Sequence, residues 1–139
     1  MNRFLRVAFV HSNKDKRLVS LVRYMVSLFE KEGWTAKIIE AENTTSPVSL
    51  RPFDLIFVGS QVLSLWGGKI SPEVVTFLQG ASGMEGKKVV AYVRPNLFGT
   101  DKALKRLMSN MESQGAFVID FEALKSEKEA KELVKRHLK

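Results

Sequence analysis

The chain has 139 residues, of which 45% are hydrophobic, and this suits one domain with one core, over residues 1–139. It has no cysteine, which excludes a disulfide framework, a thiolate nucleophile and cysteine-based metal sites. The 22 basic and 15 acidic residues leave a net charge of +7, which favours an acidic partner. No apolar run reaches the roughly 20 residues that span a bilayer, so we expect a cytoplasmic protein.

The first half of the chain predicts a strand, a helix and a second strand. Residues 6–10 form a short apolar run of β type. Apolar side chains then recur at helical spacing, which predicts an amphipathic helix that ends at Gly33. β-Branched residues predict a strand over 34–40. Residues 41–53 form a predicted loop, interpreted as either a short irregular helix or a functional excursion.

Strands and helices continue to alternate in the second half. Three apolar runs predict strands over residues 55–58, 88–93 and 116–120. Ser71 followed by Pro72 predicts a helix start, with a hydroxyl to cap the helix and a proline already near its helical φ. The helix after the fourth strand is predicted to begin at Thr100 or Asp101 and to end at Gly115.

The last helix is predicted to begin at Ser126, where Glu129 completes a capping box. Its lysines alternate with glutamates, which is typical of a solvated helix face, and His137 is expected to be exposed there. Short apolar strands separated by helices require a mostly parallel sheet with right-handed crossovers. We therefore predict an α/β fold, a three-layer α/β/α sandwich.

Nearly the whole chain resembles a flavodoxin-type domain. The resemblance rests on Val-Gly-Ser-Gln-Val at 58–62, on the proline-started helix within 70–78, and on the strand at 87–93 with its glycine-containing loop and helix. It implies a five-stranded parallel sheet in the order 2-1-3-4-5. It also implies a site for flavin mononucleotide (FMN) between strands one and three, where the strand order reverses.

The first loop, residues 11–16, departs from the hydroxyl-and-glycine pattern of that family. It has no glycine to supply the positive φ that a phosphate-binding nest often uses, and Asp15 brings a negative charge. Lys14 and Lys16 offset this charge if their side chains turn inward. The resemblance places the phosphate of FMN in this degenerate loop, at Ser12, Asn13, Lys14 and Lys16.

The loops after the third and fourth strands carry the residues that the resemblance places around the flavin ring. Trp66 covers one face, Leu97 or Phe98 covers the other, with Phe98 as the residue assigned, and Gln61 lies beside the ring. The alternative for Trp66 is a plug of the crevice or a contact with a second subunit, and the alternative for Phe98 is burial in the core. His11 lacks an evident carboxylate partner and is interpreted as structural, and no catalytic or metal-binding residue is predicted.

Two functions from different classes stay open, and so does the question of enzymatic activity. The first is a flavoprotein that binds FMN and transfers electrons. The second is a cofactor-free module of the same fold for protein interaction or regulation, which the degenerate first loop favours.

The expected partner is a redox or regulatory protein, acidic in charge, and a homodimer is left open. Membrane contact is not expected, and nucleic acid ranks last because the aromatic spacing of single-strand binders is missing.

Overall fold

The computed structural model describes residues 5–44, 46–63 and 67–138. Its elements in chain order are β1 (Arg6–His11), α1 (Lys16–Lys31), β2 (Thr35–Glu40), the 3₁₀ helix η1 (Ala41–Asn43), β3 (Leu55–Gln61), α2 (Pro72–Gly80), β4 (Lys88–Arg94), α3 (Thr100–Glu112), β5 (Phe117–Ala123) and α4 (Glu127–Lys135). All neighbouring strands pair in parallel, in the order β2-β1-β3-β4-β5. The predicted strand order is confirmed. No helix in the described ranges is long and apolar enough to cross a membrane.

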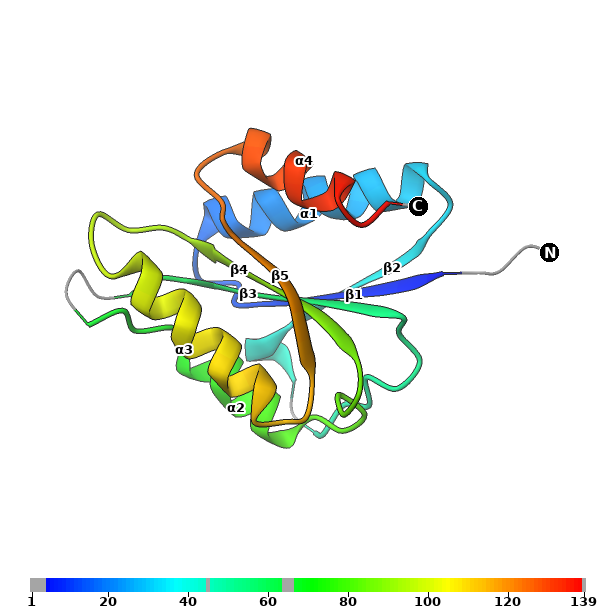
Figure 1. Ribbon diagram of the computed structural model, residues 1–139, viewed down its shortest axis with the longest axis horizontal. Helices are drawn as coiled ribbons and strands as arrows, with labels where there is room; N and C mark the ends of the chain where they lie inside the picture. Colours follow the sequence, from blue (N-terminus) through cyan, green and yellow to red (C-terminus); the bar gives the residue numbers. More distant parts are fainter. Residues whose placement is uncertain (1–4, 45, 64–66, 139) are drawn as a thin grey trace.

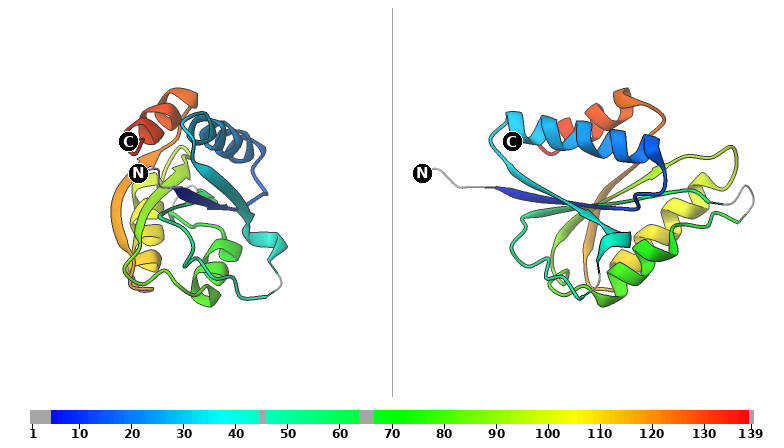
Figure 2. Two further views of the ribbon diagram at one scale, coloured as in Figure 1. Left: turned by 90° about the vertical axis from the view of Figure 1, so that its right-hand side faces the viewer. Right: turned by 180° about the vertical axis from the view of Figure 1, so that it is seen from behind.

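Helices cover both faces of the sheet, which confirms the predicted three layers (Figure 1). α1 and α4 lie together on one face, and α2 and α3 lie together on the other (Figure 2). Because all strands run the same way, their carboxyl ends meet at one edge of the sheet. We call this the carboxyl edge, and its described loops are residues 12–15, 62–63, 67–71, 95–99 and 124–126.

An aromatic cluster fills the core between the sheet and α1. The rings of Phe9 and Phe57, on neighbouring strands, stack with their centroids 4.6 Å apart, and Phe29 of α1 meets Phe57 edge-on at 5.5 Å. Tyr92 on β4 is fully buried beside this cluster, and burial raises the pKa of its hydroxyl. Gly59 on β3 leaves the space that the Tyr92 ring occupies, because a Cβ there would overlap the ring.

β3 and β5 each end three residues later than their apolar runs predicted. β3 continues to Gln61, because its backbone still pairs with β4 as far as Arg94. β5 continues to Ala123 and contains an irregularity in its register where it pairs with Val89 and Val90 of β4. Backbone pairing does not require apolar side chains, so the polar residues in both extensions hid them from the sequence pattern.

The predicted helix starts are confirmed by their capping contacts. The Ser71 hydroxyl accepts a hydrogen bond from the Val74 N–H at 3.3 Å, with Pro72 in the first turn. Ser126 and Glu129 form the predicted capping box at α4. These caps fix where α2 and α4 begin, directly at the carboxyl edge.

His137 follows α4 and is mostly buried, unlike the exposed position that its sequence suggested. Its Nε2 lies 2.8 Å from Asp120 Oδ2 on β5, and its side chain is 13% exposed. Arg136 Nε donates to the same oxygen at 2.8 Å. Partial burial by itself would raise the pKa of Asp120, but the hydrogen bonds from Arg136 and His137 outweigh it and hold the pKa below its ordinary value. These contacts tie the C-terminal turn to the edge strand.

Candidate functional site

The connections that leave β1 and β3 at the carboxyl edge run to opposite faces of the sheet. β2 flanks β1 on one side and β3 flanks it on the other, so α1 covers one face and α2 the other. A crevice forms where the order reverses in this way, and open α/β sheets bind their ligands there. In this chain the first loop, η1 and the start of α2 lie around that point.

Glu42 of η1 places its carboxylate on the first loop. Its Oε2 accepts a hydrogen bond from the Ser12 hydroxyl at 2.5 Å, and its Oε1 accepts one from the Asn13 N–H at 2.8 Å. Ser12 is fully buried, and its Oγ also accepts a hydrogen bond from the Lys14 N–H at 3.3 Å. Two donors of the loop, the Ser12 hydroxyl and the Asn13 N–H, therefore converge on an anion, and that anion is a side chain of the chain itself.

Asp15 occupies the first amides of α1 in a similar way. Its Oδ1 accepts hydrogen bonds from the N–H groups of Arg17 at 2.9 Å and Leu18 at 3.2 Å. A helix start of this kind offers free N–H groups to a phosphate. Here the Asp15 side chain satisfies two of them as the helix cap.

The two lysines predicted at the phosphate lie in different surroundings. Lys14 Nζ is 3.4 Å from Glu73 Oε2 at the start of α2. Desolvation raises the pKa of Glu73, but its own backbone N–H, the Ser71 hydroxyl and Lys14 outweigh this and hold the pKa below its ordinary value. Lys16 lines a separate recess that faces the start of α4. The structure thus brings the Ser12 hydroxyl and the Asn13 N–H to Glu42, and the Lys14 N–H to Ser12.

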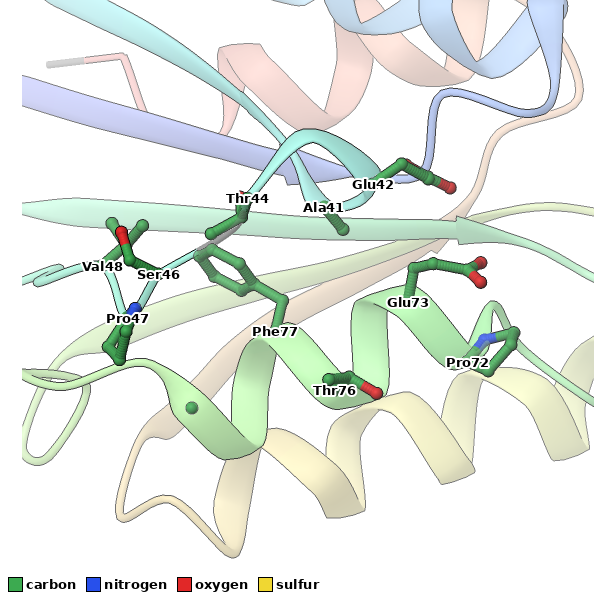
Figure 3. A pocket seen from close by; sticks show the side chains of 11 residues that line it. Ala41, Glu42, Thr44, Ser46, Pro47, Val48, Pro72, Glu73, Thr76 and Phe77 are labelled. Carbon is green, nitrogen blue, oxygen red and sulfur yellow. The ribbon is translucent and has the colours of Figure 1, made fainter.

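A pocket of about 420 Å³ lies between the segment after β2 and helix α2 (Figure 3). Val48 and Phe77 contribute apolar lining. Figure 3 shows Glu42 and Glu73 at the end of this pocket nearer the carboxyl tips of the strands. Glu42 therefore borders both the first loop and an open space into which its side chain has room to turn.

The loops after β3 and β4 are held against each other. Asn96 Nδ2 donates to the Val62 carbonyl at 3.3 Å, and the Val62 N–H donates to the Arg94 carbonyl at 3.1 Å. Gly68 has a φ of 60°, and a Cβ there would overlap Lys102 in the first turn of α3. This glycine therefore serves the close packing of its loop on α3.

Large apolar side chains in these loops reach the surface. Leu63 is 48% exposed, Leu97 78% and Phe98 47%. Phe98 is therefore a surface residue, and the alternative of core burial is wrong. Gln61 is buried at the end of β3, and its Oε1 has no hydrogen-bond partner within the described ranges. Trp66 lies outside the described residues, so its role at a ring stays a prediction.

His11 has the structural surroundings that its sequence context suggested. It is the last residue of β1 and is 1% exposed, with its Nδ1 2.7 Å from the Ser12 carbonyl oxygen.

Sequence reasoning missed Glu42, which lies 30 residues from Ser12 in the chain. The available signal was weak: a carboxylate in the loop after strand two, which is the neighbour of strand one in the predicted order.

No family model and no curated protein matches the sequence. Solved structures match it over most of its length. Flavodoxin 1 from Bacillus cereus superimposes with a TM-score of 0.74 at 12% identity, covering 94% of this chain and 93% of that chain. The Megasphaera elsdenii flavodoxin gives a TM-score of 0.71 at 17% identity, covering 93% and 96%. The Fusobacterium nucleatum flavodoxin bound to FMN gives 0.57 at 12% identity, covering 86% and 68%.

The chain therefore has a flavodoxin-like fold, and at these identities the likeness concerns the fold alone. FMN is the cofactor that this fold implies. The phosphate end of the crevice does not fit it as arranged, because Glu42 and Asp15 occupy donors that a phosphate would use. A phosphate dianion there would face two carboxylates, and like charges at such short range repel strongly.

Proposed function

We propose that this chain is a flavodoxin-fold module that works without FMN and docks a protein partner at its carboxyl edge. The observation that carries the proposal is the Glu42 carboxylate, which accepts hydrogen bonds from Ser12 and Asn13. A group tethered to the chain competes with any free ligand at a high effective concentration. FMN would have to break both hydrogen bonds and then approach Asp15, so the closed loop disfavours the cofactor.

Exposed apolar side chains at the same edge support docking. Leu63, Leu97 and Phe98 are about half exposed or more, and such side chains on neighbouring loops mark interaction sites. Lys69, in the loop after β3, and Lys102, in the first turn of α3, are exposed near them in the sequence. Together with the net charge of +7, these lysines favour an acidic partner, because complementary charge speeds association and selects the partner.

A flavin titration tests the cofactor-free proposal. Purified chain is mixed with FMN, and flavin fluorescence and retention of yellow colour after gel filtration are measured, with the Fusobacterium nucleatum flavodoxin as a positive control. We expect no quenching up to high micromolar FMN and a colourless protein. Stoichiometric FMN in the wild-type chain would refute the proposal. The Glu42→Ala variant vacates the first loop, and we expect any FMN affinity it shows to exceed that of wild type.

Surface variants test the docking part. Leu97→Ser removes the most exposed apolar side chain of the carboxyl edge, and Phe117→Ser, at the amino end of β5, removes one that is 64% exposed. The wild-type chain is used to capture a partner, which is then identified, purified and titrated against all three proteins. We expect Leu97→Ser to weaken binding at least tenfold and Phe117→Ser to leave it unchanged. Equal binding by both variants would place the interface elsewhere.

FMN binding with electron transfer is the second candidate. The apolar, exposed loops after β3 and β4 favour it, because they supply a surface on which a flat ring packs. In this case Gln61, Trp66 and Phe98 take the ring positions that the sequence predicted. The pocket beside Glu42 gives that side chain the space to leave the loop when a phosphate displaces it. A wild-type protein that is yellow on purification would favour this candidate over the first.

A further inference from the structure

A second recess lies at the carboxyl edge, on the face of the sheet covered by α1 and α4. It has a volume of about 360 Å³ and is lined by the first turns of α1, the end of β4 and the loop that leads into α4. Figure 1 shows the starts of α1 and α4 at the same end of the molecule. We call it the basic recess, because its charged lining residues are Lys16, Arg17, Arg94, Lys125 and Glu127.

The four cations of the basic recess have only one carboxylate among its lining residues. Across the part of the chain that the structure describes, the ion pairs of lysine and arginine lie elsewhere: Lys14 pairs with Glu73, and Arg136 pairs with Asp120 and Glu122. Like charges gathered around a concave surface raise the local concentration of counter-ions. The basic recess is therefore a region of positive potential that an anion would neutralise.

Among the described residues, two buried polar atoms at the carboxyl ends of β4 and β3 lack hydrogen-bond partners, and the β4 residue lines the basic recess. Arg94 Nε and Gln61 Oε1 are both without a partner within the described ranges. These residues end β4 and β3 and are register partners, so their side chains leave the sheet on the same face. Most buried polar atoms in native proteins are hydrogen-bonded, and an exception calls for an explanation. A bound ligand that accepts from Arg94 and donates to Gln61 would satisfy both atoms.

We propose that the basic recess binds a small phosphorylated molecule. The Arg94 guanidinium donates to the phosphoryl oxygens, since its planar fork matches their geometry, and Lys16, Arg17 and Lys125 add positive charge around the group. Gln61 is not a lining residue but lies next to Arg94 on the neighbouring strand, and its Oε1 accepts a hydrogen bond from a hydroxyl of a ligand that reaches past Arg94. The volume suits such a molecule, because small-molecule sites occupy roughly 300–1,000 Å³. The cations line a concave recess and not an extended stripe, which favours a small ligand over a nucleic-acid backbone.

This site is separate from the loop closed by Glu42, so the inference does not rest on the proposed function. The test uses the full chain labelled with ¹⁵N and titrated with pyrophosphate, with sodium chloride added to a matched ionic strength as a control. We expect saturable shifts of the backbone amides of residues 16–21 and 125–127 and of the Arg94 Nε–H resonance. Shifts confined to Asn13 and Lys14 would instead show that the first loop takes the anion, and this result would overturn the inference. The cofactor-free proposal is tested by the flavin titration and not by this experiment.

Charge-matched variants identify the residues responsible. Arg94→Gln should weaken pyrophosphate binding at least tenfold, whereas Lys131→Gln, an exposed residue of α4 outside the recess, should change it less than twofold. Lys125→Gln in the exposed loop before α4 provides a second test if Arg94→Gln fails to fold, and it should weaken binding several-fold. Equal affinities of the recess variants and Lys131→Gln would overturn the proposal.

A competition experiment tests the class of ligand. Ribose 5-phosphate is compared with ribose and with a single-stranded oligonucleotide at the same resonances. We expect ribose 5-phosphate to shift the Arg94 Nε–H and Gln61 side-chain amide signals and ribose to leave both unchanged. An oligonucleotide that displaces pyrophosphate from these resonances at a lower concentration than ribose 5-phosphate would overturn the assignment to a small molecule.

Discussion

Replacing Glu42 by alanine tests the central observation about the first loop. The change removes the acceptor of two hydrogen bonds, from the Ser12 hydroxyl at 2.5 Å and the Asn13 N–H at 2.8 Å. Ser12 is fully buried, so water does not readily replace the lost carboxylate at its hydroxyl. We therefore expect Glu42→Ala to destabilise the fold, although Glu42 belongs to a short 3₁₀ helix outside the sheet.

The magnitude follows from the charge on the acceptor. Hydrogen bonds to charged groups contribute about 1.5–3 kcal/mol each, and the two bonds share one carboxylate that is partly exposed, so we expect a loss of roughly 2–3 kcal/mol. Unfolding entropy of about 2.1 cal/mol/K per residue gives about 0.3 kcal/mol/K for 139 residues. The melting temperature should therefore fall by roughly 7–10 °C.

Chemical and thermal unfolding of three variants measure this effect. Glu42→Gln keeps one acceptor oxygen without its charge and should lose about half as much as Glu42→Ala. Glu30→Ala is the matched control, because it removes the same charge from an exposed position in α1. If Glu42→Ala unfolds at the same denaturant concentration as Glu30→Ala, the carboxylate does not close the first loop and the argument against FMN loses its basis.

Other substitutions test the packing, capping and titration described above. Gly59→Ala should destabilise the fold by about 3 kcal/mol, because its methyl group overlaps the Tyr92 ring. Gly80→Ala, with open space at the end of α2, should stabilise the fold by up to about 1 kcal/mol. Urea unfolding midpoints measure both changes, and equal midpoints for the two variants would contradict the packing of Gly59 against Tyr92. Asp15→Ala should lower stability by about 1 kcal/mol through loss of the α1 cap, and Asp15→Asn should retain most of it in thermal melts. Because the folded pKa of Asp120 lies below its ordinary 3.8, its stabilisation is complete above that pH and is lost as the pH falls through the folded pKa. Wild type and Asp120→Asn should therefore differ at pH 7, still differ near pH 4, and converge only as the pH falls through the folded pKa of Asp120, below 3.8. A difference that stays constant down to the lowest pH would show that ionisation plays no part.

The amino-acid sequence by itself determined the order and type of the elements. Apolar side chains at helical spacing in α1 and short apolar runs in the strands are local patterns, and each follows from the face that its element buries. Ser71–Pro72 and Ser126–Glu129 marked two helix starts for the same reason, since a cap acts within one turn. Alternation of strand and helix then restricted the topology to a parallel sheet, because parallel strands need crossover connections.

Only the tertiary structure decided what occupies the carboxyl edge. The contact of Glu42 with Ser12 joins positions 30 residues apart, and it depends on where η1 leaves β2, which no local pattern specifies. Lys14 and Lys16 are two residues apart in sequence, yet one pairs with Glu73 and the other lines the basic recess. The direction of a long side chain is set by the neighbours that packing supplies, so the sequence indicated the crevice but not its contents.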